Sequence, residues 1–325
     1  MIVAIGAFDG FHRGHKALLD RAAASGRSWG VLTFRRHPGA MRDATFKGLF
    51  TFEERRLLER YFDIPVVCRI DFTPEISAMS PEEFLDYLAE RFEIDGIVVG
   101  DGFRFGHERA GTTGFLERDC ARRGWSVDIV PVQCAGDGTP ICSTGIRNAV
   151  AAGDLSRAWG FLGYPFFCMS RVIQGCRRGR RLGFPTANIA LDPEKVTPRR
   201  GVYASVVLCD GRWHIGAANL GTTPTFSASD EVRLEVNVVD FEGDLYGKTI
   251  MVFLLEHVRD EIRFEGEKAL KERVKSDTEY IVGRVSRAFS EHPRIWEKFA
   301  SSLPSSSGSQ ELFDGRSLTG TVHLT

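Results

Sequence analysis

Two histidines, His12 and His15, stand three positions apart, shortly after the apolar run Ile2–Ile5. On a helix, residues with this spacing lie on the same side. The start of a helix also presents backbone N–H groups and the positive end of its dipole. Gly10 and Gly14 would let the backbone approach a ligand closely. The combination predicts a polyphosphate site in which the imidazoles stabilise charge as a phosphoryl bond breaks.

The alternative for the bare histidine pair is two surface residues on an ordinary amphipathic helix, since short motifs often match by chance. A zinc site is not favoured, because it needs three or four ligands and no nearby cluster of Cys or Glu supplies the others. The wider sequence around the pair therefore has to decide between a phosphate site and an ordinary helix.

A second stretch, residues 175–188, carries four arginines between glycines and leads into Gly-Phe-Pro-Thr-Ala-Asn. Glycines permit a tight loop, and guanidinium groups pair bidentately with phosphate. Thr186 and Asn188 offer neutral oxygens that suit Mg²⁺ bound together with phosphates. Taken alone, the stretch is more typical of a solvated basic loop followed by an Asx-type turn.

Composition limits the class of protein. The chain has 325 residues, enough for two domains, and its formal net charge of −1 gives no electrostatic reason for binding nucleic acid or an acidic membrane. No apolar run reaches the length of a membrane span, and the N-terminal strand has no basic leader before it. Seven cysteines, none in Cys-x-x-Cys spacing, argue against a disulfide framework. We therefore expect a cytoplasmic protein.

In the first half of the chain, strand-like apolar runs alternate with helical patterns. The runs lie at 2–7, 28–34, 65–70, 96–100 and 126–132, and the helical patterns at 12–24, 52–62, 81–92 and 112–123. This alternation predicts an α/β domain with a parallel, Rossmann-like sheet. Ligands bind such sheets at the carboxyl ends of strands, where His12, Asp101 and the segment after Val132 lie.

From residue 165 to 256 the pattern changes to short alternating strands separated by turns, which predicts a small antiparallel β-barrel. A helix is expected from about 266 to 288. The serine-rich tail from Ser301 has low complexity and is expected to be disordered.

The sequence around the histidines, Gly-Ala-Phe-Asp-Gly-Phe-His-Arg-Gly-His at 6–15, resembles the Gly-x-Phe-Asp-Gly-x-His-x-Gly-His signature of nucleotidyltransferases. The nearest match is the adenylyltransferase half of bacterial bifunctional riboflavin kinase/FMN adenylyltransferases. Residues 33–38, 100–106 and 141–147 are similar to further motifs of that family. The resemblance implies that His12, His15 and Arg147 are catalytic, that Phe103 and Phe105 line a flavin site, and that ATP phosphates contact Gly6, Phe8, Gly10, Gly14, Ser143 and Thr144.

Four positions depart from the family pattern, and one of them is Arg36, which stands in place of a proline in the motif at 33–38. Ala7 stands where the family usually has Asn, Gly102 where it has Asp or Asn, and Cys142 replaces the first serine of Ile-Ser-Ser-Thr. Losing a hydrogen bond to a ligand costs about 0.5–1.5 kcal/mol. Asp101 compensates only if its turn is rearranged, so this half is expected to be weakened or adapted to another acceptor.

The second half resembles riboflavin kinases. Gly-Phe-Pro-Thr-Ala-Asn at 183–188 is similar to their signature, which implies that Thr186 and Asn188 hold Mg²⁺ with ATP. By the same resemblance, Glu235 is the general base that takes the proton of the riboflavin 5′-hydroxyl, a role typically worth 10²–10⁴-fold. The alternative is an outward-facing glutamate on a barrel strand. Further residues implied are Gly175, Arg178, Gly183 and Pro185 for ATP and Arg259 and Phe264 for the flavin.

We therefore expect an FMN adenylyltransferase-like domain at 1–158, a riboflavin kinase domain at 163–290 and a disordered tail at 301–325. The substrates would be ATP, riboflavin and FMN, with Mg²⁺ as cofactor and FAD as final product. Three alternatives remain: a monofunctional riboflavin kinase with a degenerate adenylyltransferase domain, a non-catalytic flavin or nucleotide sensor, and nucleotide transfer to a different acceptor.

Overall fold

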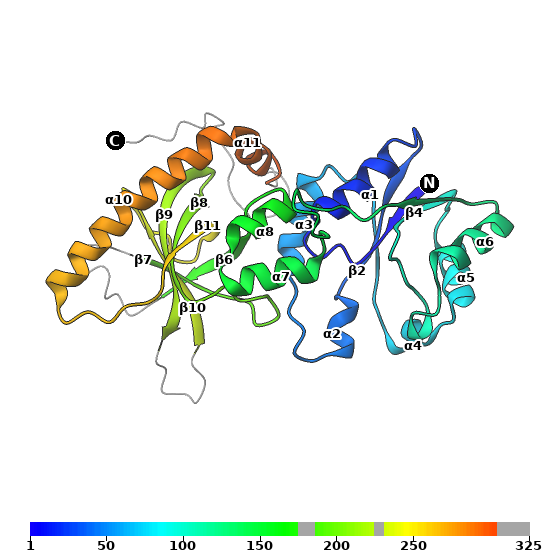
Figure 1. Cartoon of the computed structure of the whole chain (residues 1–325), viewed down its shortest axis with the longest axis horizontal. Helices are drawn as coiled ribbons and strands as arrows, with labels where there is room; N and C mark the ends of the chain where they lie inside the picture. Colours follow the sequence, from blue (N-terminus) through cyan, green and yellow to red (C-terminus); the bar gives the residue numbers. More distant parts are fainter. Residues whose placement is uncertain (175–185, 224–230, 304–325) are drawn as a thin grey trace. The chain divides into compact units, whose positions relative to one another are not determined.

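The structure is a computed structural model that describes residues 1–174, 186–223 and 231–303 (Figure 1). The chain divides into two compact units, Met1–Ser143 and Thr144–Thr325. The domain limits expected from the sequence, 1–158 and 163–290, remain predictions.

The N-terminal unit is built on a five-stranded parallel sheet in the order β3-β2-β1-β4-β5. This confirms the predicted α/β class. The strand order changes direction between β1 and β4, and the carboxyl ends at such a switch point are where open α/β sheets bind ligands. The strands are β1 (Ile2–Ile5), β2 (Trp29–Phe34), β3 (Val67–Ile70), β4 (Gly96–Gly100) and β5 (Ser126–Val130).

The four predicted helices of this unit are present as α1 (Arg13–Ala23), α3 (Phe52–Tyr61), α5 (Pro81–Arg91) and α6 (Thr113–Arg123). Helix α5 begins with a capping box, in which the Glu83 N–H donates to Ser80 Oγ and the Ser80 N–H donates to the Glu83 carboxylate. Two five-residue helices, α2 (Pro38–Arg42) and α4 (Pro74–Ala78), and the 3₁₀ turn η1 (His107–Arg109) were not predicted.

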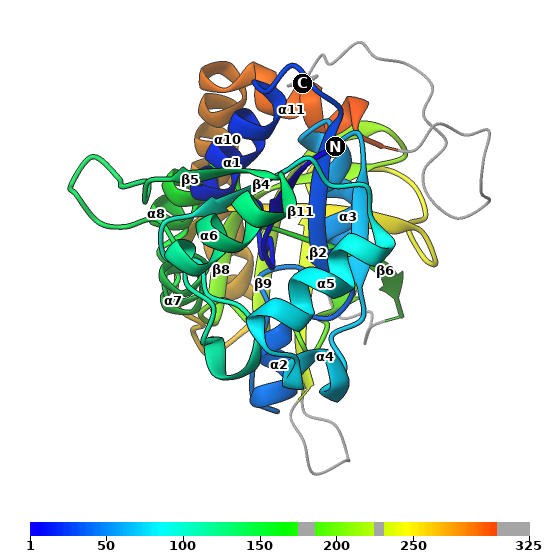
Figure 2. The ribbon, with the colours of Figure 1, turned by 90° about the vertical axis from the view of Figure 1, so that its right-hand side faces the viewer.

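Helices α5 and α6 lie side by side on one face of the sheet, as Figure 2 shows. Their apolar residues, including Phe84, Leu88 and Leu116, pack against Ile5 and Val99 of the sheet. Because strand side chains alternate between faces, the buried residues next to Ile5 and Val99 in their strands point to the other face of the sheet. The sheet is thus covered on both sides, and its strand ends remain available for a site.

The C-terminal unit contains a closed, six-stranded barrel in the order β10-β7-β6-β11-β8-β9, which confirms the predicted antiparallel barrel. Its strands are β6 (Phe167–Ile173), β7 (Thr186–Ala190), β8 (Gly201–Cys209), β9 (Arg212–Thr223), β10 (Glu231–Val238) and β11 (Thr249–Arg259). Two helices precede it, α7 (Ser143–Ala152) and α8 (Leu155–Leu162), and two follow it, α10 (Glu267–Glu291) and α11 (Pro293–Ser301).

Helix α11 is held on the barrel by aromatic packing around Trp296. The Trp296 ring lies 4.7 Å from Phe289, 5.5 Å from Trp213 and 5.7 Å from Phe253, measured between ring centroids. Ser301, the first residue of the predicted tail, is the last residue of this helix. Residues 304–325 of that tail lie outside the described residues.

Within the described ranges, no helix has both the length and the apolar character needed to cross a membrane.

Candidate active sites

The turn after β1 delivers the chain to α1 in a strained conformation. Phe8, Gly10 and Phe11 have positive φ angles of 46°, 91° and 38°. Bulky residues rarely adopt this region, and such strain is typically kept where function requires it. The rings of Phe8 and Phe11 are buried and stack 5.2 Å apart. The packing of these two buried rings therefore stabilises the turn.

His12 and His15 lie together at the start of α1. His12 is the N-cap residue, and its Nδ1 accepts a hydrogen bond of 3.3 Å from the His15 N–H. The two imidazole rings stack with centroids 3.7 Å apart. Because Nδ1 of His12 is an acceptor, the neutral ring carries its proton on Nε2.

His15 carries an unused polar atom. Its Nδ1 is buried and has no hydrogen-bond partner in the part of the chain that the structure describes. Burial, followed by the proximity of His12 and His37, holds the pKa of His15 well below its ordinary value of 6.5. A buried polar atom without a partner requires an explanation, and a bound anion is one that fits this helix start.

Gly14 and Ser143 bring the segment before α7 against the histidine turn. A Cβ on Gly14 would lie 3.0 Å from His12 Cε1 and 3.4 Å from the Ile141 carbonyl oxygen, so a side chain would crowd both. Ser143 Oγ donates a 2.9 Å hydrogen bond to the Asp9 carbonyl. The beginning of the second predicted phosphate motif, up to Ser143, therefore meets the histidine turn, although 134 positions separate Ser143 from Asp9.

Thr144 and Arg147 follow Ser143 in the first turns of α7. Arg147 Nη2 donates to Thr144 Oγ1 at 3.0 Å, so the hydroxyl orients the guanidinium group. Their contact with a triphosphate remains a prediction.

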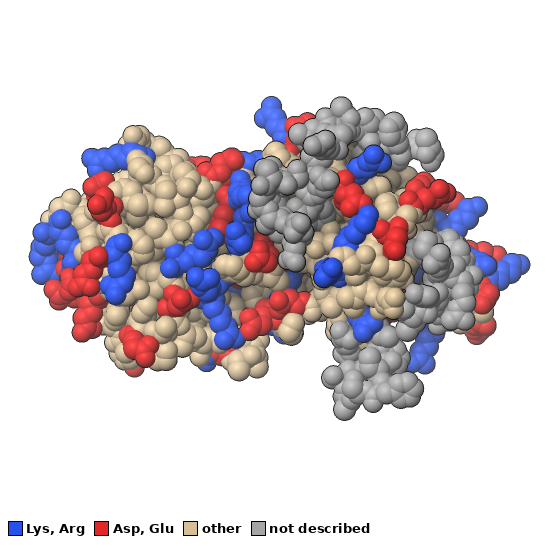
Figure 3. Space-filling model, turned by 180° about the vertical axis from the view of Figure 1, so that it is seen from behind, with Lys and Arg blue, Asp and Glu red and all other residues tan. Residues whose placement is uncertain are grey.

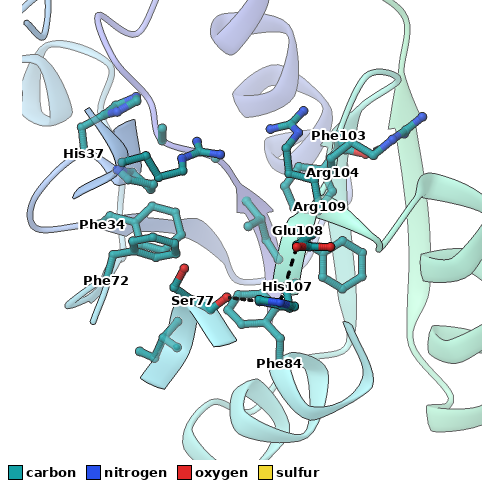
Figure 4. Close-up of a pocket in the computed structure, with 18 of the residues that line it drawn as sticks. Phe34, His37, Phe72, Ser77, Phe84, Phe103, Arg104, His107, Glu108 and Arg109 are labelled. Atoms are coloured by element: carbon teal, nitrogen blue, oxygen red, sulfur yellow. Dashed lines mark hydrogen bonds and ion pairs between the residues drawn. The ribbon is translucent and has the colours of Figure 1, made fainter. Parts of the chain in front are cut away.

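A cavity of about 510 Å³ opens at the carboxyl ends of β1, β2 and β4 (Figure 4). This volume is in the usual range for a small-molecule site. Gly6 and Ala7 lie on its wall. Its floor is aromatic, with Phe103 and Phe105 stacked 5.5 Å apart. The polar residues on its wall are His37, Arg42, Ser77, Arg104, His107, Glu108 and Arg109.

Two of the departures from the family pattern, Ala7 and Gly102, border this cavity. A Cβ on Gly102 would meet no atom within 4 Å, so there is room for a polar side chain that this sequence does not supply. Asp101 is exposed and is not among the residues that line the cavity. It therefore does not take the place of the missing group.

In the barrel, Glu235 of β10 lies in register between Asn188 of β7 and Asn219 of β9. Its neighbours Leu234 and Val236 are fully buried, whereas Glu235 is only partly buried and its side chain points to the opposite face of the strand. Burial raises the pKa of Glu235; Arg233 opposes this effect and Glu261 adds to it. A raised pKa makes a carboxylate a stronger base.

Thr186 and Asn188 line a second cavity of about 550 Å³ together with the segment 241–246. Asn188 Nδ2 approaches the Thr186 carbonyl at 3.5 Å, which turns the amide oxygen of Asn188 the other way. A hydroxyl and an amide oxygen are hard, neutral ligands, and they fit Mg²⁺ that shares its shell with phosphates and water. Among the residues described, no cluster of three or more His, Cys, Asp or Glu forms a metal site. The predicted ATP ligands Gly175, Arg178, Gly183 and Pro185 lie outside the described residues.

Arg259 and Phe264 lie near one another, with the guanidinium carbon 5.9 Å from the ring centroid. The sequence did not reveal two partners of this region. Asp277 of α10 forms an ion pair with Arg259, and Glu261 Oε1 accepts a 3.4 Å hydrogen bond from Asn219 Nδ2. The only sequence signal for Asp277 was its i,i+4 spacing from Arg273.

Comparison with known proteins gives one consistent family. Residues 1–145 match the family model for FAD synthetase, and residues 162–283 match that for riboflavin kinase. Bifunctional riboflavin kinase/FMN adenylyltransferases from Listeria monocytogenes and Escherichia coli K12 are 31% and 35% identical over 85% of this chain and 90% of their own. A crystal structure described as a macrolide-efflux protein from Streptococcus pneumoniae aligns with a TM-score of 0.78 and 30% identity, over 86% of this chain and 92% of that one.

Proposed function

The chain belongs to the bifunctional riboflavin kinase/FMN adenylyltransferase family, and from this premise we propose the role of each site in two consecutive reactions. The barrel unit phosphorylates riboflavin with ATP to give FMN and ADP. The N-terminal unit transfers the adenylyl group of a second ATP to FMN, giving FAD and pyrophosphate.

In the adenylyl transfer, a phosphate oxygen of FMN attacks the α-phosphorus of ATP, and the bond from that phosphorus to the pyrophosphate oxygen breaks. His12 and His15 hydrogen-bond the triphosphate and stabilise the charge that moves onto the leaving group. Ser143, Thr144 and Arg147 hold the triphosphate, and the apolar cavity beside Phe103 and Phe105 takes the flavin ring. The observation that carries this assignment is the buried, unpartnered Nδ1 of His15.

In the kinase reaction, the 5′-hydroxyl oxygen of riboflavin attacks the γ-phosphorus of ATP and ADP leaves. Glu235 accepts the hydroxyl proton, which its raised pKa favours. Thr186 and Asn188 are the residues that would hold Mg²⁺. When bound, the ion neutralises phosphate charge.

One assay tests both assignments: the purified chain is incubated with ATP, Mg²⁺ and either riboflavin or FMN, and the flavins are separated by chromatography. Glu235→Gln should reduce FMN formation by about 10²-fold or more and spare FAD formation from FMN. His15→Ala should do the reverse, so each variant is the folding control of the other. Loss of both reactions in either variant would contradict the two-site assignment.

A monofunctional riboflavin kinase is the second candidate, because Ala7 and Gly102 remove polar groups from the wall of the N-terminal cavity. FMN without FAD in the same assay would establish it. No turnover of either flavin would indicate a sensor, and adenylyl transfer to another compound would indicate a different acceptor.

We further propose small-molecule substrates and a cytoplasmic location. Acidic and basic side chains are interspersed on the face shown in Figure 3, in keeping with the formal net charge of −1. Cys68, Cys120, Cys134 and Cys209 are free thiols, which is typical of proteins in a reducing compartment.

A further inference from the structure

Helix α10 carries a buried carboxylate that two guanidinium groups share. Asp277 Oδ2 accepts a hydrogen bond of 2.8 Å from Arg259 Nε and lies 2.7 Å from its Nη2, while Oδ1 lies 3.0 Å from Arg273 Nε. The side chains of Arg259 and Asp277 are only 12% and 7% exposed. Because desolvation offsets much of the attraction in a buried pair, such a pair is weak evidence for stability. The consequence that matters here is geometric: the ion pair fixes the orientation of the Arg259 side chain.

Arg259 is the last residue of β11, and the chain that follows it leads to Asn219, which lies in register with Glu235. Arg259 Nη1 donates to the Asp260 carbonyl at 2.9 Å. Two residues on, Glu261 accepts a hydrogen bond from Asn219, the residue in register with Glu235. A side chain on Gly221 would collide with the Glu261 carboxylate, so the glycine leaves room for this contact.

These contacts form a continuous connection from α10 to the general base. Asp277 holds the Arg259 guanidinium plane in one orientation, and Arg259 in turn holds the start of the segment 260–264. That segment places Phe264 beside Arg259 and Glu261 beside Asn219. A guanidinium edge and an aromatic face suit a planar ligand whose rim carries carbonyl oxygens and ring nitrogens.

We propose that Asp277 is a positioning residue for riboflavin: it fixes Arg259 and the segment 260–264 next to Glu235. The inference rests on the proposed kinase function of the barrel. Asp277 itself need not touch substrate. It acts through the orientation of Arg259.

A second contact between β11 and α10 offers a matched control for the Asp277 variants. Glu256 of β11 accepts hydrogen bonds from Arg284 Nε at 2.7 Å and from the Tyr280 hydroxyl at 2.6 Å, both on α10. Removing Arg284 therefore weakens the docking of α10 on β11 without breaking a contact of Arg259. An effect of general helix docking would appear in Arg284→Gln, and an effect of positioning would not.

The experiment uses the full chain and four variants: Asp277→Asn, Asp277→Glu, Arg259→Lys and Arg284→Gln. The KM values of riboflavin and ATP, the kcat of FMN formation, FAD formation from FMN and the Tm are measured for each. Asp277→Asn and Arg259→Lys should raise the riboflavin KM about tenfold, the factor for one charge-assisted hydrogen bond. The ATP KM and FAD formation should stay unchanged. Asp277→Glu should restore part of the loss, and Arg284→Gln should leave the riboflavin KM at the wild-type value.

An unchanged riboflavin KM in Asp277→Asn, or an equal rise in Arg284→Gln, would overturn the proposal. If Asp277→Asn does not fold, Asp277→Glu decides the outcome, and an unchanged riboflavin KM in that variant would overturn the proposal. If the wild-type chain forms no FMN, the proposed function fails instead, and riboflavin affinity, measured by quenching of flavin fluorescence, still tests the positioning role in the same variants.

Discussion

The imidazole rings of His12 and His15 stack with their centroids 3.7 Å apart and their planes 18° apart, at the first turn of α1. Two positive charges at this separation would repel one another. Together with burial, this holds the pKa of His15 well below 6.5. His15 is therefore a neutral hydrogen-bonding group at this helix start rather than a pre-charged one.

This relationship predicts how the stability of the N-terminal unit depends on pH. In the unfolded chain His15 binds a proton near pH 6.5, whereas in the folded chain it binds one only at lower pH. The unfolded state thus holds more protons in that window, and stability should fall as the pH is lowered from about 6.5. The Tm measured between pH 8 and 5 should show this fall, and His15→Gln should reduce its slope.

His107→Gln, at an exposed histidine of the same unit, is the control for replacing an imidazole by an amide. Added inorganic triphosphate should raise the Tm of the wild type more than that of His15→Gln, since a ligand that binds only the folded state stabilises it. Identical slopes in the wild type and His15→Gln would show that His15 does not titrate in this way.

Gly14 gives a second prediction, on packing. A Cβ at this position would crowd His12 and the Ile141 carbonyl, so Gly14→Ala should displace the imidazole and lower FAD formation about tenfold or more. FMN formation should be unaffected.

Gly114 is the matched control for Gly14, since it is also the second residue of an 11-residue helix and its Cβ would meet nothing closer than 3.7 Å. Gly114→Ala should stabilise the chain by about 0.5–1 kcal/mol and leave both activities intact. Equal FAD rates in the two variants would show that the close approach to His12 has no catalytic consequence.

The hydroxyl of Ser143 gives a third prediction. Its hydroxyl donates to the Asp9 carbonyl at 2.9 Å and so joins the start of α7 to the histidine turn. Ser143→Ala should lower stability by about 0.5–1.5 kcal/mol and reduce FAD formation, while FMN formation persists. Urea unfolding and the flavin assay measure the two effects. Ser143→Thr keeps the hydroxyl and should retain most of both. If Ser143→Ala matches the wild type in the FAD rate, the hydroxyl contacts neither the turn nor ATP in a way that matters.

The sequence predicted the elements that repeat regularly and missed those that depend on distant partners. The five strands and four long helices of the N-terminal unit follow from apolar periodicity and caps such as Ser80. Helix α11 was missed because its packing depends on Trp296 meeting aromatic side chains from the barrel and α10. Short helices such as α2 have too few residues to show a period.

The same reasoning applies to the sites. The spacing of His12 and His15 indicated that they share a side, because both lie on one helix turn. Nothing local indicated that Asp277 would hold Arg259 or that Glu261 would reach Asn219, since 18 and 42 positions separate these pairs. The role of Gly14 beside a ligand stays a prediction, and nothing in its sequence neighbourhood indicated that a side chain there would meet His12 and the Ile141 carbonyl.

Glu235 predicts the pH dependence of the kinase reaction. Burial raises its pKa above the ordinary 4.5, Arg233 lowers it and Glu261 raises it. Because the base must be ionised, kcat/KM for FMN formation should decline as the pH falls through this raised pKa, so its acid limb should lie above 4.5. Glu261→Gln removes one like charge and should move the limb to lower pH. A limb that stays in place in Glu261→Gln would show that Glu261 does not act on the base.

Gly102 gives the last prediction, on the strength of the adenylyltransferase. The cavity wall has room at this position, because a Cβ would meet nothing within 4 Å. Gly102→Asn should therefore change stability by less than about 0.5 kcal/mol. If the added amide hydrogen-bonds the flavin, FAD formation should rise about two- to tenfold, the range for one hydrogen bond. Gly100 is the matched control: it has the same open surroundings but does not line the cavity, so Gly100→Asn should leave the FAD rate unchanged. A rise in both variants, or in neither, would show that the glycine at 102 does not limit the reaction.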